Sequence, residues 1–292
     1  MMVLAFPDYL SQARRLAVRL DVPLLEVVLH HFPDGESYIR LSQSLPEHLI
    51  VCRSLNQPND KLIELLLCAT TARELGVKRL TLVAPYLSYM RQDIAKQTGE
   101  AVSQRIIGKL LADLFDDVLA VDPHLHRISS LTQAIPIKNA ISLTAAEEIG
   151  NFLKKKFKHA LLLGPDSESE QWVATIAANI GFDYAIAEKS RLGDKQLEMV
   201  LPEGDFASQL VVIIDDMAST GRTLAKAADL LQAAGCKDIY AVVTHALFCG
   251  DAHAHILNAG VKNVWSTDSI DHSSSCIRLD TLLADAIKTM TR

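Results

Sequence analysis

The sequence from 211 to 224 reads Val211-Val-Ile-Ile-Asp-Asp-Met-Ala-Ser-Thr-Gly-Arg-Thr-Leu224. An apolar run that passes through acids and small residues into a helical pattern predicts a buried strand, a turn and a helix. Further strand-like runs lie at Leu49–Val51, Leu80–Ala84, Leu161–Leu163 and Ala241–Val243, and a helical pattern covers Lys61–Leu75. Strands that alternate with helices in this way indicate βαβ units. The sequence therefore predicts an α/β fold with mainly parallel sheets flanked by helices.

Two segments resemble each other and predict an internal duplication. One is Arg73-Glu-Leu-Gly-Val-Lys-Arg-Leu-Thr-Leu-Val-Ala-Pro85, and the other is Gln232-Ala-Ala-Gly-Cys-Lys-Asp-Ile-Tyr-Ala-Val-Val-Thr244. In both, a helix is expected to end at the glycine, where a left-handed backbone costs least, and a strand follows. Upstream, Leu49–Ser54 occupies the place of Val211–Asp216 but lacks the acidic pair. We therefore expect two similar domains, residues 1–140 and 141–292.

Composition indicates an ordinary globular protein. The chain has 292 residues, of which 49% are hydrophobic and 22% charged, and this is enough apolar material for a buried core. The net charge of −6 argues against nucleic acid as a main partner. The five scattered cysteines lack metal-ligand spacing and favour a reducing compartment. Since there is neither a secretory signal at the start nor an apolar run near the roughly 18 residues of a membrane span, we expect a soluble, cytoplasmic protein with no membrane partner.

The acids and the turn after the 211–214 run have the chemistry of a ribose phosphate site. Asp215 and Asp216, expected in a loop at the carboxyl end of the strand, can accept hydrogen bonds from the two vicinal hydroxyls of a ribose. The next residues offer N–H groups and hydroxyls to a phosphate at a helix N-terminus, namely Ser219, Thr220, Gly221, Arg222 and Thr223. The alternative is an ordinary strand followed by a capped helix with solvated acids. The segment resembles the phosphoribosyl pyrophosphate loop that phosphoribosyltransferases and ribose-phosphate pyrophosphokinases share.

Other segments separate these two families. They are His31-Phe-Pro-Asp-Gly-Glu-Ser37, Ala84-Pro-Tyr-Leu-Ser-Tyr-Met-Arg-Gln-Asp93, Val121-Asp-Pro-His124, Gly164-Pro-Asp166, Glu188-Lys-Ser-Arg191 and Ser266-Thr-Asp-Ser-Ile270. In type, order and spacing they resemble the motifs of ribose-phosphate pyrophosphokinases over nearly the whole chain. The resemblance implies two phosphoribosyltransferase-like domains. It also implies transfer of the diphosphoryl group of MgATP to the C1 hydroxyl of ribose 5-phosphate, giving 5-phosphoribosyl 1-pyrophosphate and AMP.

The segment from 32 to 36 reads by itself as a turn, with Pro33 fixing φ and Gly35 free to adopt a positive φ. The resemblance implies that Phe32 stacks on adenine and that Asp34 and Glu36 accept hydrogen bonds from it. It further implies that these residues serve the active site of a neighbouring subunit. We therefore expect a homo-oligomer, a dimer or larger, whose ATP site is shared between subunits.

The resemblance also assigns the polar residues that follow two other strands. Arg91, Gln92 and Asp93 would bind ATP, although a lone surface arginine is often merely solvated. His124 and His126 have a spacing that by itself suggests a transition metal or an exposed loop. The resemblance instead implies that His124, together with Asp166, lies around the Mg²⁺ of MgATP.

Two cations are expected to act in the reaction itself. Residues 185–191 read as one short strand, in which Lys189 and Arg191 are alternate positions and would point to the same side. The resemblance implies that both are catalytic, and the following Leu192-Gly-Asp-Lys195 reads as a mobile flap. Without the resemblance they would be solvated charges at the end of a strand.

The sequence departs from the family at Ser167-Glu168-Ser169, because a small residue and two glycines usually follow the aspartate there. Glu168 brings a negative side chain to a place where the backbone normally approaches phosphate. The residues after Tyr38 lack the pattern associated with allosteric control by ADP and phosphate. Two other functions fit parts of the sequence, a non-catalytic regulatory homologue of such an enzyme and a phosphoribosyltransferase.

Overall fold

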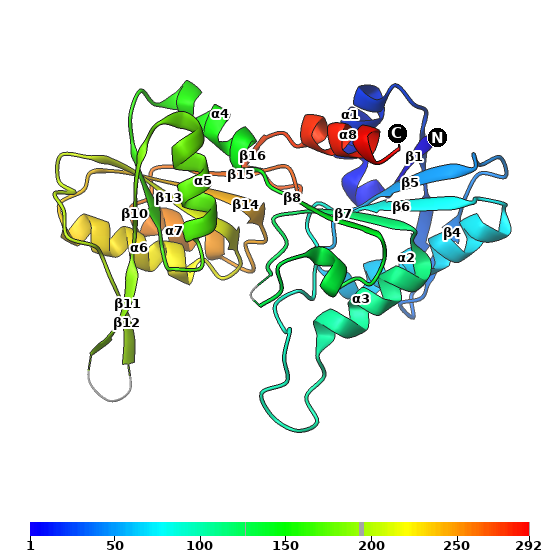
Figure 1. Cartoon of the computed structure of the whole chain (residues 1–292), viewed down its shortest axis with the longest axis horizontal. Helices are drawn as coiled ribbons and strands as arrows, with labels where there is room; N and C mark the ends of the chain where they lie inside the picture. Colours follow the sequence, from blue (N-terminus) through cyan, green and yellow to red (C-terminus); the bar gives the residue numbers. More distant parts are fainter. Residues whose placement is uncertain (126, 193–195, 292) are drawn as a thin grey trace. The chain divides into compact units, whose positions relative to one another are not determined.

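The chain forms two compact units (Figure 1), and the computed structural model describes residues 1–125, 127–192 and 196–291. The first unit comprises Met1–Thr144, Ser269–Asp271 and the segment from Leu279 onward. The second comprises Ala145–Asp268 and His272–Arg278. These units differ from the proposed division into 1–140 and 141–292, because the chain returns to the first unit after completing the second. Among the described residues, none of the helices has the length and apolar character that crossing a membrane requires.

The first unit is built on a parallel six-stranded sheet of order β2-β1-β5-β6-β7-β8. Its strands are β1 (Met2–Ala5), β2 (Leu24–Glu26), β5 (His48–Cys52), β6 (Arg79–Val83), β7 (Asp117–Val121) and β8 (Asn139–Leu143). Its helices are α1 (Leu10–Leu20), α2 (Pro58–Glu74), α3 (Ser103–Leu114) and α8 (Asp280–Met290), with short 3₁₀ turns at Pro7–Tyr9 and Leu131–Gln133. The antiparallel hairpin of β3 (Val28–His31) and β4 (Ser37–Arg40) is a separate two-stranded sheet.

The second unit repeats this plan with the order β10-β9-β13-β14-β15-β16, again parallel. Its strands are β9 (Leu161–Gly164), β10 (Asp183–Ile186), β13 (Leu210–Ala218), β14 (Asp238–Ala246), β15 (Val264–Thr267) and β16 (Ser275–Ile277). Its helices are α4 (Ala146–Lys156), α5 (Glu170–Ile180), α6 (Arg222–Ala233) and α7 (Ala252–Asn258). A separate hairpin of β11 (Glu188–Leu192) and β12 (Gln196–Val200) again follows the second strand and extends away from the sheet (Figure 1).

The register of the strands confirms the predicted duplication. Leu49 pairs with Leu80 in the first unit, and Val211 pairs with Ile239 at the matching place in the second. The glycines aligned from the sequence, Gly76 and Gly235, both have positive φ, 92° and 86°, just after α2 and α6. The fold class is therefore as predicted, α/β with two similar units that each contain a parallel sheet flanked by helices.

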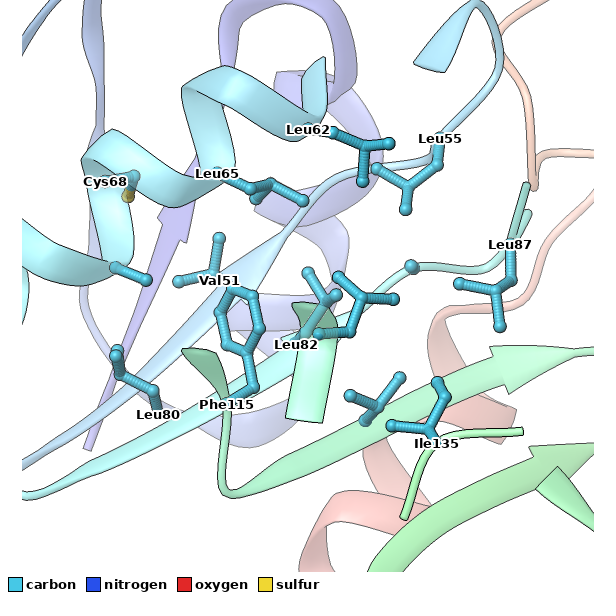
Figure 2. Close-up of a cluster of buried hydrophobic side chains, with 14 of the residues drawn as sticks. Val51, Leu55, Leu62, Leu65, Cys68, Leu80, Leu82, Leu87, Phe115 and Ile135 are labelled. Atoms are coloured by element: carbon cyan, nitrogen blue, oxygen red, sulfur yellow. The ribbon is translucent and has the colours of Figure 1, made fainter. Parts of the chain in front are cut away.

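Each unit has its own apolar core. In the first unit, Leu80 and Leu82 of β6 and Val51 of β5 pack against Leu62 and Leu65 of α2 (Figure 2). Each such side chain stabilises the fold by about 1.5–3 kcal/mol when it is fully buried. The second core joins β13 and β14 to α6 and α7 in the same way. These cores hold the carboxyl ends of the sheet strands in place, near which several of the candidate site residues lie.

Two local predictions were wrong. The expected single strand over 185–191 is two strands, because β10 belongs to the parallel sheet and β11 to the hairpin, with Ala187 between them. Asp215 and Asp216 do not lie in a loop but inside β13, which continues through Met217 and Ala218 along β14. Apolar residues after the acids carry the strand further than the acidic pair suggested.

Candidate functional site

The acidic pair of β13 lies near the carboxyl end of a central strand. Asp216 is buried, with 4% exposure, and its N–H donates a hydrogen bond to Asp215 Oδ1 at 3.0 Å. Burial raises the pKa of Asp215 well above its usual value, and the negative charges of Asp216 and Asp166 raise it further. Three carboxylates thus gather near the carboxyl ends of the paired strands β9 and β13, and they favour hydroxyl donors or a cation there.

The loop after this pair leads into the first turn of α6. Gly221 precedes the helix with φ of 72°, and a Cβ at this position would lie 2.9 Å from the Ala252 carbonyl oxygen. The loop is fixed from outside, because the Phe248 N–H donates to Ala218 O at 2.9 Å and the Cys249 N–H donates to Ser219 O at 2.8 Å. Since Gly221 has no side chain to cap the helix, the N–H groups of the first turn of α6 can face an anion.

The remaining loop residues present polar groups to solvent. Thr220, Arg222 and Thr223 are exposed, and Ser219 is half-buried. This arrangement brings together all seven residues that the sequence proposed for ribose 5-phosphate, on one strand, one loop and one helix start. It suits a phosphate beside a diol, and the assignment stays a prediction.

We predict that Gly221→Ala destabilises the protein more than Gly181→Ala does. Both glycines have positive φ, 72° and 73°, but only Gly221 is in close contact with another segment, since no atom lies within 4 Å of a Cβ at Gly181. The alanine at 181 therefore adds only backbone strain of about 1–2 kcal/mol, whereas the alanine at 221 must also push α7 away. Thermal unfolding of the two variants measures the difference. Equal losses of stability would contradict the close contact.

The loop after β9 carries Asp166 and the departure from the family pattern. Asp166 Oδ1 accepts hydrogen bonds from the Glu168 N–H at 3.1 Å and the Ser169 N–H at 3.3 Å. Ser169 is buried, and its Oγ donates to Asp166 O at 2.5 Å. A Cβ on Gly164 would lie 2.5 Å from the same Oγ, so this glycine makes room for the serine. Ser169 thus has a structural role, whereas Glu168 is exposed to solvent.

The segment proposed for adenine is the tip of the β3–β4 hairpin. The Gly35 N–H donates to Phe32 O at 2.9 Å, the Phe32 N–H donates to Glu36 O at 2.8 Å, and Gly35 has φ of 94°. This is a type I turn closed by a glycine bulge, which Pro33 and Gly35 favour. Phe32 is 44% exposed, and Asp34 and Glu36 are exposed as well, so an aromatic face and two carboxylates are presented together.

The residues proposed for the ATP phosphates lie between β6 and α3. Arg91 and Gln92 are exposed. The Asp93 carboxylate is instead 3% exposed and forms an ion pair of 2.6 Å with Arg127. Asp93 therefore has a partner within its own unit that the sequence did not suggest, whereas Arg91 and Gln92 lie where a ligand can reach them.

His124 follows the end of β7 and is half-buried. Just before it, Asp122 is buried and has φ of 39°, an uncommon conformation outside glycine. Holding a residue there costs on the order of 1–3 kcal/mol, and such strain gathers at functional sites. His126 lies outside the described residues. Among the residues that the structure describes, no group of three or more His, Cys, Asp or Glu side chains is arranged to hold a metal ion.

The two proposed catalytic cations belong to β11, where residues 189 and 191 pair with Met199 and Leu197 of β12. The structure describes the backbone of Lys189 and Arg191 but not their side chains. Residues 193–195 of the predicted flap lie outside the described residues. The roles of Lys189 and Arg191 stay predictions.

Sequence reasoning missed a buried ion network in the first unit. Arg53 lies at the place of Asp215 and is 3% exposed, and its Nη1 is 2.5 Å from Oε2 of Glu64, which is 1% exposed. Asp8 Oδ1 lies 3.2 Å from Arg53 Nε, and Lys61 Nζ lies 2.7 Å from Asp8 Oδ2. The only sequence feature that could have indicated this network is Glu64, a single acid among the apolar residues of a predicted helix.

Comparison with known proteins decides the family. Residues 1–114 match the model of the N-terminal domain of ribose phosphate pyrophosphokinase, and residues 128–276 match that of the phosphoribosyl transferase domain. A ribose-phosphate pyrophosphokinase of Methanopyrus kandleri is 31% identical over 295 residues, covering 100% of both chains. One of Pyrococcus abyssi is 34% identical over 256 residues, covering 88% of each. The chain belongs to the ribose-phosphate pyrophosphokinase family.

A solved structure of this family has the same fold. The phosphoribosylpyrophosphate synthetase of Mycobacterium smegmatis is 22% identical to this chain, with a TM-score of 0.83, and the match covers 99% of this chain and 98% of that one. Membership of the ribose-phosphate pyrophosphokinase family, predicted from the motifs, is confirmed.

Proposed function

We propose that the protein transfers the diphosphoryl group of MgATP to the C1 hydroxyl of ribose 5-phosphate, giving 5-phosphoribosyl 1-pyrophosphate and AMP. One observation carries this proposal, the Asp215–Asp216 pair in β13 followed by the start of α6 after Gly221, in a chain that matches the Methanopyrus kandleri relative over its full length. The two carboxylates would hold the ribose hydroxyls, and the loop and helix start would hold the 5-phosphate. A reducing, cytoplasmic location fits the free cysteines and these substrates.

The other residues would bind and orient ATP. Phe32 would stack on adenine, and Asp34 and Glu36 would accept hydrogen bonds from it. Arg91, with Gln92, would hold the phosphates through a guanidinium that can contact two oxygens at once. With the phosphates fixed, the C1 hydroxyl attacks the β-phosphorus and AMP leaves. Catalysis then depends on alignment and on neutralising charge, which Lys189 and Arg191 would do.

Mg²⁺ is the cofactor that this proposal requires. Magnesium takes few protein ligands besides phosphates and water, which agrees with a single carboxylate from Asp166 and the His124 side chain. The raised pKa of Asp215 supports a cation as well, because the neighbouring negative charges of Asp216 and Asp166 contribute to that rise, after burial. When bound, Mg²⁺ would offset the charge of the ATP phosphates.

A homo-oligomer with a shared ATP site is also part of the proposal. The first unit exposes apolar side chains on α2, namely Ile63 at 55%, Leu66 at 37% and Leu67 at 39%, and an exposed apolar face of this kind favours a protein partner.

We predict complementation between two inactive variants, Phe32→Ala/Asp34→Ala and Asp215→Ala/Asp216→Ala. If one subunit supplies the adenine hairpin to the ribose loop of another, mixing should form hybrid sites with both halves intact and restore part of the activity. The rate of AMP formation measures this. No rescue, with subunit exchange verified by mass spectrometry of labelled subunits, would show that each chain builds its own site.

A phosphorus NMR time course with MgATP and ribose 5-phosphate tests the reaction. Loss of the ATP signals with equal gain of AMP and of a sugar diphosphate is expected. ADP as the product would contradict diphosphoryl transfer. No reaction by a folded protein that binds both substrates would favour the regulatory homologue, whereas nucleotide formation from a free base and 5-phosphoribosyl 1-pyrophosphate would favour a phosphoribosyltransferase.

A further inference from the structure

The first unit contains a counterpart of the ribose loop that cannot bind a sugar. Its strand β5 is followed directly by Arg53 and Ser54, which align with Asp215 and Asp216 of β13. The buried Arg53 guanidinium lies 4.0 Å from the centre of the Phe6 ring and forms ion pairs with Glu64 and Asp8. A buried cation, engaged by two acids and an aromatic ring, thus occupies the position that the proposed diol-binding carboxylates have in the second unit.

The second oxygen of Glu64 reaches the hairpin of β3 and β4. His31 Nε2 lies 2.7 Å from Glu64 Oε1, and Ser37 Oγ donates to the same oxygen at 2.9 Å. Burial raises the pKa of Glu64, but the Arg53 charge and the bonds from His31, Arg53 and Ser37 outweigh it and hold that pKa below its usual value. Because an ionised carboxylate only accepts, His31 Nε2 carries the donated hydrogen.

These two contacts lie at the base of the adenine turn. His31 and Ser37 pair with each other across the hairpin, and Phe32–Glu36 is the turn between them. The hairpin is a two-stranded sheet outside the six-stranded one, and such a hairpin by itself is marginally stable in water. Glu64 in α2 therefore fastens both strands of the hairpin at the last pair before Phe32.

We infer that Arg53 and Glu64 form a buried brace that positions the Phe32–Glu36 turn for the nucleotide. This inference rests on the proposed function, since it takes the turn as the adenine site. Arg53 holds the Glu64 carboxylate ionised and fixed, and Glu64 holds the hairpin. Fixing the turn before binding removes part of the entropy cost of ordering it around a ligand. The place that binds ribose in the second unit thus serves nucleotide binding in the first.

The variant His31→Ala/Ser37→Ala tests the brace and leaves the buried Arg53–Glu64 pair intact. We expect faster hydrogen exchange of the backbone amides of residues 28–40 and about tenfold weaker binding of MgATP by calorimetry, since two hydrogen bonds to a charged group are lost. Binding of ribose 5-phosphate should stay within about twofold of wild type, because the second unit is unchanged. His31→Gln, which can still donate to Glu64, should recover most of the MgATP affinity. Arg40→Ala, at the open end of the same hairpin, is the matched control and should change neither measurement.

Unchanged hydrogen exchange in the double variant would overturn the inference, as would faster exchange with unchanged MgATP affinity. Both measurements are made without turnover. A wild-type protein that binds MgATP but forms no sugar diphosphate would therefore refute the proposed reaction and leave the brace standing. A wild-type protein that binds no MgATP would refute both.

Discussion

Replacing Lys189 with alanine is expected to lower kcat by about 10³-fold, equivalent to about 4 kcal/mol of lost transition-state stabilisation. The lysine would place its charge where the β-phosphoryl group and the leaving oxygen of AMP become more negative, an effect that is much smaller in the bound substrates. KM for either substrate should therefore change less than about threefold. Steady-state kinetics of the purified variant measure both parameters.

Lys237→Ala is the matched control for this variant. Lys237 is an exposed lysine between α6 and β14, before the amino end of β14, whereas the loop proposed for ribose 5-phosphate follows the carboxyl end of β13. Its removal changes the net charge by the same amount and should leave kcat unchanged. If Lys189→Ala instead raised KM and kept kcat, the lysine would only help to hold substrate.

Replacing both Asp215 and Asp216 with alanine is expected to abolish productive binding of ribose 5-phosphate. Two charge-assisted hydrogen bonds to the sugar are worth on the order of 3–6 kcal/mol, so affinity should fall by at least about 100-fold. Because Asp216 is buried inside β13, the double asparagine variant, which keeps the shape of both side chains, separates loss of charge from loss of packing. Calorimetry with ribose 5-phosphate measures the change, and an affinity within threefold of wild type would refute the assignment.

The single variant Asp215→Asn is also expected to make the substrate-free protein more stable. The pKa of Asp215 is raised in the folded protein, so the folded state binds this proton more tightly than the unfolded state. Protonation of Asp215 therefore contributes fully to the free energy of unfolding of the wild type below the ordinary pKa of an aspartate, about 3.9. This contribution is lost as pH rises through the elevated pKa of the folded state. Asparagine does not titrate, so the gain in Tm over wild type should grow with pH across that window. A gain that shrinks with rising pH would contradict the crowding of carboxylates.

Local features of the fold could be predicted from the sequence. The strand-like runs at Leu49–Val51 and Val211–Ile214 are confirmed because apolar residues bounded by turn residues have few other ways to fold. The turn after β3 could be predicted because Pro33 fixes its own φ and Gly35 can adopt a positive φ. The duplication was visible because two helix ends needed the same left-handed glycine.

Contacts between distant residues could not be predicted in the same way. Glu64 is seen in the sequence only as an acid in an apolar helix, and its partners Arg53, His31 and Ser37 are brought to it by the order of strands and the hairpin. The same holds for the Arg127 partner of Asp93. The extension of β13 past Asp216 depends on the neighbouring strand β14, which offers ladder partners that local patterning does not reveal.

The return of the chain after the second unit imposes an order on synthesis. Helix α8 packs on α1, and Asp280 of α8 accepts a hydrogen bond from Arg19 Nε at 2.8 Å. On the ribosome α8 emerges roughly 10 to 50 s after α1, at about 5–20 residues per second. During that interval the surface of α1 that α8 will cover faces water or a chaperone. The last segment of the second unit ends at Arg278, so this unit can fold before the first. The N-terminal unit completes its fold last, after α8 has been synthesised.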